Sequence, residues 1–123
     1  MKRAMIVDDV EVSRYILRSL LEGEGFEVKE AQDEAEATRL STSFMPDVVF
    51  LDWHLKKTVA SGLLSGLRKS LQTTAKIIVV SGVADKDETR QVKELNIDGF
   101  VAKPVGKENI RQALEAAGMC SGA

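Results

Sequence analysis

The chain has 123 residues, the length of one ordinary domain, and we expect residues 1–123 to form a single domain. Hydrophobic residues make up 44% and charged residues 29%, a composition that excludes a disordered chain and indicates a globular protein with a core. The formal net charge of -2 argues against direct nucleic-acid binding as the main function, because that needs a clustered cationic surface.

Other features of the composition indicate the compartment. The single cysteine, Cys120, cannot form an internal disulfide and suits a reducing environment. No apolar stretch approaches the roughly 20 residues that a membrane-spanning helix needs. The basic start is followed by an apolar run that ends at Asp8, too early for a signal peptide. We therefore expect a cytoplasmic protein without membrane insertion, with a tail that frays from about residue 118.

The first half of the chain predicts two strand–helix pairs. Residues 4–7 are continuously apolar, as expected for a strand that is covered on both faces. A mixed run at residues 26–28 is typical of an edge strand. Asp33 with Glu36 predicts a capping box for the second helix, which Pro46 ends. The first predicted helix ends at Gly23. Its apolar residues lie at helical spacing and are Val12, Ile16, Leu17, Leu20 and Leu21.

The second half repeats the pattern three times. Continuous apolar runs at residues 48–51 and 77–80 predict two more covered strands, and residues 100–102 predict a second edge strand. Helical spacing follows each of these strands. The three predicted helices are residues 60–71, a helix that Asp85 and Glu88 cap and that holds Val92 and Leu95, and a last helix with Ile110, Ala113, Leu114 and Ala117 that ends at Gly118.

A strand followed by a helix, repeated five times, predicts an α/β fold with one parallel sheet and helices on both faces. We expect a single (βα)5, flavodoxin-like, doubly wound sheet with the strand order 2-1-3-4-5. In such sheets, ligands bind beyond the carboxyl ends of the strands, near the point where the strand order reverses. The residues that follow the strands are therefore the first candidates for chemistry.

Polar side chains follow four of the predicted strands. Asp8 and Asp9 follow the first, Asp52 the third, Ser81 the fourth and Lys103 the fifth. Carboxylates that meet at one edge repel one another, and a hard divalent cation such as Mg²⁺ removes that cost. One carboxylate can then attack phosphorus while the cation, the lysine and the hydroxyl steady the phosphoryl oxygens. The product is an aspartyl phosphate, which water can hydrolyse.

Each of these residues also has an ordinary role when it is taken alone. An Asp after a strand often forms a turn or caps a helix, Ser81-Gly82 is a common turn dipeptide, and Lys103-Pro104 suits a solvated loop. The functional interpretation depends on their joint occurrence at the ends of neighbouring strands.

With these residues the sequence resembles the receiver domains of two-component response regulators, over essentially its whole length. The matching elements are the acidic pair, the acceptor-like Asp52, Ser81, Lys103-Pro104 and Phe100, which matches the family's switch aromatic. The resemblance implies that Asp52 is the phosphorylation site of a phosphorelay. It also implies an Mg²⁺ (or Mn²⁺) site made by Asp9 and Asp52 directly, Asp8 through water, and the backbone carbonyl of His54.

The resemblance implies partners and a switch as well. Lys103 and Ser81 would contact the phosphoryl oxygens, and Phe100 would turn inward and reshape the face of the fourth helix, fifth strand and fifth helix for a downstream protein target. The donor would be a phosphohistidine of a sensor histidine kinase or phosphotransfer protein. The protein would not be a conventional enzyme, although it would catalyse its own phosphorylation and dephosphorylation. The Lys103-Pro104 bond is often cis in this family.

One loop departs from the family pattern. The family usually has Met-Pro and then a glycine eight residues past the acceptor, whereas these positions hold Leu55, Lys56 and Ala60. We expect the loop at residues 56–61 to be longer or differently shaped. We hypothesise that Lys56 or Lys57 lies near the phosphorylation site, with two solvated lysines as the plainer alternative. His54 is expected to line the mouth of the pocket rather than to act as a general base.

Other functions compete with this interpretation. A small Mg²⁺-dependent phosphohydrolase with an aspartyl nucleophile would separate its two acids by one residue and carry a cap domain, and neither feature is present. A flavodoxin-like cofactor binder needs backbone amides where residues 8–11 are acidic. A degenerate receiver that binds partners without phosphorylation stays open because of the atypical loop. We expect no output domain, and the sequence does not distinguish a stand-alone regulator from part of a longer protein.

Overall fold

The computed structural model describes residues 2–55, 60–71, 74–82 and 97–119. They form a five-stranded sheet in the order β2-β1-β3-β4-β5, and every neighbouring pair of strands is parallel. The predicted fold class and strand order are confirmed. The elements are β1 (Arg3–Val7), α1 (Glu11–Gly23), β2 (Glu27–Ala31), α2 (Glu34–Ser43), β3 (Val48–Asp52), α3 (Ala60–Ser70), β4 (Lys76–Ser81), β5 (Gly99–Ala102) and α5 (Lys107–Ala116).

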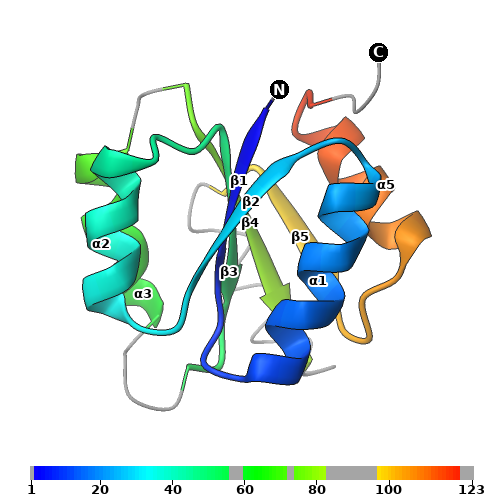
Figure 1. Cartoon of the computed structure of the whole chain (residues 1–123), viewed down its shortest axis with the longest axis horizontal. Coiled ribbons are helices and arrows are strands. Elements are labelled where there is room, and N and C mark those ends of the chain that lie inside the picture. Colours follow the sequence, from blue (N-terminus) through cyan, green and yellow to red (C-terminus); the bar gives the residue numbers. More distant parts are fainter. Residues whose placement is uncertain (1, 56–59, 72–73, 83–96, 120–123) are drawn as a thin grey trace.

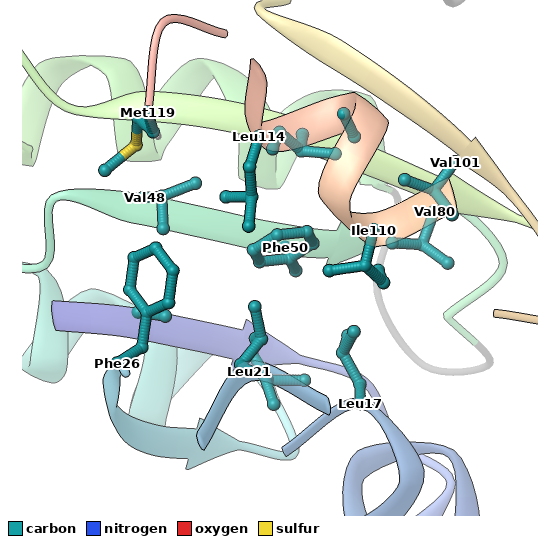
Figure 2. Packing of buried hydrophobic residues seen from close by; sticks show 14 of the residues in the cluster. Leu17, Leu21, Phe26, Val48, Phe50, Val80, Val101, Ile110, Leu114 and Met119 are labelled. Atoms are coloured by element: carbon teal, nitrogen blue, oxygen red, sulfur yellow. The ribbon is translucent and has the colours of Figure 1, made fainter. Parts of the chain in front are cut away.

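The sheet separates two hydrophobic cores. Helices α1 and α5 cover one face, and α2 and α3 cover the other (Figure 1). The central strand β3 is buried throughout, with Val48 and Phe50 in the first core and Val49 and Leu51 in the second. Figure 2 shows Phe50 among the side chains of α1 and α5. Burial on both faces explains why the strand has a continuous apolar run instead of an alternating one.

Helix α2 begins close to the predicted position. The Asp33 carboxylate accepts a hydrogen bond from the Glu36 N–H at 2.9 Å, as a capping box requires. The return bond differs from the prediction, because the Glu36 carboxylate accepts from the N–H of Gln32, at 3.5 Å, and not from that of Asp33. The helix ends before Met45, whose φ of 53° is in the left-handed region.

Helix α1 buries less of its apolar side than the spacing of its residues indicates. Leu17 and Leu21 are buried against the sheet, but Val12 is 66% exposed and Ile16 is 43% exposed. Tyr15, on the same stretch, is 70% exposed. The first turns of α1 lie where β1 has already ended, so they have less sheet to pack against (Figure 1).

The other predicted helices divide into described and undescribed parts. The structure confirms α3, from Ala60, and α5, after which Gly118 has a φ of 78°. Met119 is 5% exposed and packs in the core beside Leu114 (Figure 2). The predicted helix with Val92 and Leu95, and the tail from residue 120, lie outside the described residues. No helix in the described parts is long and apolar enough to cross a lipid bilayer.

Candidate functional site

The strands bring the predicted site residues to one edge of the sheet, the lower edge in Figure 1. Asp52 and Ser81 are the last residues of β3 and β4, and Asp8 and Lys103 directly follow β1 and β5. The strand register keeps these ends level, since Val7 pairs with Leu51, Asp52 with Val80 and Ser81 with Ala102. Parallel pairing alone therefore gathers residues that are far apart in the sequence.

Three carboxylates and one ammonium group meet at this edge. Asp8, Asp9 and Asp52 each present an oxygen, and these oxygens lie within 4.8 Å of one another. The Nζ of Lys103 lies 3.6 Å from Asp8 Oδ2 and 3.6 Å from Asp52 Oδ1. Asp8, Asp9, Asp52 and Lys103 therefore lie together at the edge where the strands end.

The electrostatics of the cluster favour a bound cation. Asp8 is 4% exposed and Asp52 is 3% exposed, so both carboxylates have lost most of their contact with water. Burial is the largest cause that raises the pKa of Asp8, and the charge of Asp52 adds to it. The Val10 N–H, which donates to Asp8 at 2.9 Å, and the charge of Lys103 lower this pKa but do not cancel the rise.

The donor set fits Mg²⁺ or Mn²⁺. In the described part of the chain, the candidate side-chain ligands are carboxylate oxygens, which hard divalent cations prefer. Among the described residues, the positive charge of Lys103 cannot by itself neutralise the cluster, because three carboxylates converge there. Asp8, Asp9 and Asp52 are the side chains that could hold the ion.

An arginine from α1 fixes the loop that carries the acidic pair. Arg14 donates one hydrogen bond to the carbonyl oxygen of Asp8, at 2.8 Å, and another to Glu30 on β2, at 3.0 Å. Glu30 also accepts from Arg18 at 2.7 Å. The acidic loop is therefore tied to both α1 and β2. Sequence analysis did not identify Arg14, because the contact depends on the position of α1 against the sheet.

His54 contacts both the acceptor and the switch candidate. Its backbone N–H donates to Asp52 Oδ1 at 3.2 Å, and its ring Nε2 lies 3.2 Å from the Ser81 hydroxyl oxygen. The residue is exposed, and a place at the mouth of the pocket stays a prediction. Phe100 is half-buried on the edge strand β5. Lys56 and Lys57 lie outside the described residues.

An apolar pocket of about 420 Å³ adjoins the acid cluster. The α1 residues Ser13, Ile16 and Leu17 line one side of it, and the segment after β5 lines the other, where the Lys103-Pro104 peptide bond is cis, as the resemblance implies. Asp8 and Lys103 line the same pocket. The apolar pocket and the charged cluster are thus one continuous surface. The sequence did not predict this pocket; its only sign there is that α1 has more apolar residues than the sheet buries.

We expect the raised pKa of Asp8 to make the stability of the metal-free protein depend on pH. Because the pKa of Asp8 is raised above its ordinary value of 3.8, the folded state binds more protons than the unfolded state above that pH. The free energy of unfolding should therefore fall as the pH rises from 3.8 through the raised pKa of Asp8. Asp8→Asn should increase the free energy of unfolding at neutral pH. Urea unfolding in EDTA measures this, with Asp33→Asn as the control; an Asp8→Asn protein no more stable than wild type contradicts it.

A parallel sheet in this order, with acids and a lysine gathered at its carboxyl edge, defines a flavodoxin-like α/β domain of the chemotaxis-regulator type. The model of the response regulator receiver domain matches residues 4–115, and the chain belongs to this family. Receiver domains of two-component systems are signal transducers that interact with histidine kinases and downstream targets, and they are in general not enzymes.

Relatives and solved structures agree with this assignment. The chain is 26% identical to chemotaxis protein CheY of Halobacterium salinarum, over 92% of this chain and 93% of that protein. It is 33% identical to transcriptional regulatory protein KdpE of Mycobacterium tuberculosis, over 95% of this chain but only 51% of that protein, so it spans about half of that relative. A Burkholderia pseudomallei response regulator, solved with a phosphorylated aspartic acid, a calcium ion and citrate, superposes with a TM-score of 0.83 at 29% identity, covering 96% of this chain and 70% of that one.

Proposed function

We propose that this domain is a cytoplasmic phosphoacceptor, in which Asp52 takes a phosphoryl group from a phosphohistidine of a sensor histidine kinase or phosphotransfer protein, with Mg²⁺ (or Mn²⁺) bound beside it. The observation that carries the proposal is the convergence of three carboxylates with the Lys103 ammonium group, 3.6 Å from two of them. The similar Burkholderia regulator, which has a phosphorylated aspartic acid and a calcium ion, supports the same chemistry.

The acceptor step needs one free carboxylate oxygen. Asp52 Oδ1 accepts from the His54 N–H and lies beside Lys103, which leaves Oδ2 as the proposed nucleophile. Oδ2 forms the new P–O bond as the P–N bond of the donor breaks, and the bonding electrons leave with the donor's imidazole nitrogen. Bound Mg²⁺ supplies positive charge to the phosphoryl oxygens. Lys103 adds its own charge, and the Ser81 hydroxyl donates a hydrogen bond at the same edge.

The donor has a suitable surface next to this site. Val12, Tyr15 and Ile16 are exposed on α1, and the apolar pocket beside them opens toward Asp8 and Lys103. Exposed apolar surface of this kind is typical of protein–protein contacts. We place the phosphohistidine domain over α1 and the segment after β5, where it can present its phosphoryl group to Asp52. The downstream target is assigned to the other proposed face, which β5 and α5 would form with the predicted fourth helix, outside the described residues, and which Phe100 would reshape.

The alternatives have less support. A degenerate receiver has no need of buried carboxylates that destabilise one another, yet Asp8 and Asp52 are both buried and close together. A phosphohydrolase needs a surface that selects a small substrate, whereas the surface beside this cluster is apolar and formed by α1. Both features favour transfer from a protein donor.

Stepwise ligand addition tests the proposal, with fluorescence of the single tryptophan as the signal. Trp53 follows Asp52 and is half-buried, and its backbone N–H donates to the Val80 carbonyl at 2.9 Å, so it reports on the end of β3. We expect a saturable change on adding Mg²⁺ and a second change on adding beryllofluoride, a phosphoryl mimic. A protein that binds Mg²⁺ but never responds to beryllofluoride would instead be the degenerate receiver.

A further inference from the structure

We propose that His54 is a positioning residue that acts as a latch: its ring holds the Ser81 hydroxyl in the resting domain and opposes the contact of Ser81 with a phosphoryl group. The inference rests on the proposed function, because it assigns a regulatory role at the same site. It concerns a side chain that has no part in the phosphoryl transfer described above.

The geometry makes His54 a bridge between two strands. Its backbone N–H donates to Asp52 Oδ1 at the end of β3, while its ring Nε2 lies 3.2 Å from Ser81 Oγ at the end of β4. Ser81 is 2% exposed, whereas His54 is exposed, so the imidazole reaches inward to a buried hydroxyl from the mouth of the site. A side chain two residues from the acceptor therefore fixes the direction of the group on the neighbouring strand.

The chemistry of the hydroxyl makes this contact competitive. A serine hydroxyl has one proton to donate, and a phosphoryl oxygen accepts hydrogen bonds but cannot donate them. When Asp52 carries a phosphoryl group, the Ser81 hydroxyl has to turn its proton toward the new oxygens. In the tautomer with its proton on Nδ1, Nε2 accepts the Ser81 proton, and this bond is then lost because the one hydroxyl proton cannot serve both acceptors. His54 thus lowers the affinity of the domain for the phosphorylated geometry.

Two substitutions separate the hydrogen bond from the bulk of the ring. His54→Leu removes the bond, and His54→Gln keeps an amide group near the position of Nε2; both retain the backbone N–H that bonds to Asp52. With saturating Mg²⁺, we expect His54→Leu to bind beryllofluoride about 2- to 10-fold more tightly than wild type, the effect of one neutral hydrogen bond. His54→Gln should stay within about 2-fold of wild type, since it can replace that bond. Titration calorimetry measures both constants.

A double substitution shows whether the effect passes through Ser81. In a Ser81→Ala background, His54→Leu should leave the beryllofluoride affinity unchanged, because the bond that it removes is already absent. An equal tightening in that background overturns the latch, and so does unchanged affinity in His54→Leu alone. Weaker binding by His54→Leu also overturns it, since His54 would then deliver the hydroxyl to the phosphoryl group. If wild type itself fails to bind beryllofluoride, the proposed function fails instead.

Discussion

Asp52→Asn is expected to abolish the gain of one phosphoryl mass that wild type shows when it is incubated with Mg²⁺ and a small phosphodonor such as acetyl phosphate. The amide has nearly the shape of the carboxylate but lacks a nucleophilic oxygen with negative charge, so no acyl phosphate can form. Asp52 is 3% exposed, lies 3.6 Å from Lys103 and is itself the last residue of β3, whereas Asp8 and Asp9 follow the end of β1. Intact-protein mass spectrometry measures the gain.

The matched control for this experiment is Asp33→Asn, which removes a carboxylate at the start of α2 and keeps an oxygen that can cap the helix. It should be phosphorylated like wild type. Asp52→Asn should also remain folded, because replacing one of the three converging acids relieves repulsion among them. A phosphoryl mass that persists in a folded Asp52→Asn protein would show that another residue is the acceptor.

The strands could be predicted because burial on both faces leaves a simple signal in the sequence. Every residue from Val48 to Asp52 is buried, and a run of four apolar residues followed by Asp records that directly. The site followed from the same logic, since parallel strands end at one edge and Asp8, Asp52, Ser81 and Lys103 each lie at an end. Topology thus places these residues without any knowledge of side-chain contacts.

The contacts that tune the site could not be predicted in this way. The His54 ring meets Ser81 across 27 positions of sequence, and Arg14 meets the Asp8 carbonyl only because α1 lies against β2. Helical spacing likewise marks Val12 and Ile16 as apolar but does not say where the sheet ends beneath them. These features depend on how whole elements pack, which periodicity does not record.

Lys103→Met is expected to slow phosphorylation by a small phosphodonor by about 10²- to 10³-fold, the usual effect of removing a charged or hydrogen-bonding group that stabilises a transition state. The lysine stem runs beside Gly82, where an added Cβ would lie 3.5 Å from Lys103 Cδ, and methionine keeps a stem of similar shape while it removes the charge. Binding of Mg²⁺ should not weaken, because the ammonium group competes with the ion for Asp8 and Asp52, from each of which it lies 3.6 Å.

Lys107→Met is the matched control, since Lys107 is exposed at the start of α5 and the change in net charge is the same. In single-turnover kinetics at saturating Mg²⁺, Lys107→Met should be phosphorylated at the wild-type rate, and only Lys103→Met should be slower. Equal losses would mean that only the overall charge of the protein matters. If neither variant slows, the ammonium group takes no part in phosphoryl transfer and only offsets the negative charge of the acids. Lys103→Met should then unfold at a lower urea concentration than wild type in metal-free buffer, since Asp8 and Asp52 would have lost the cation that lies 3.6 Å from each.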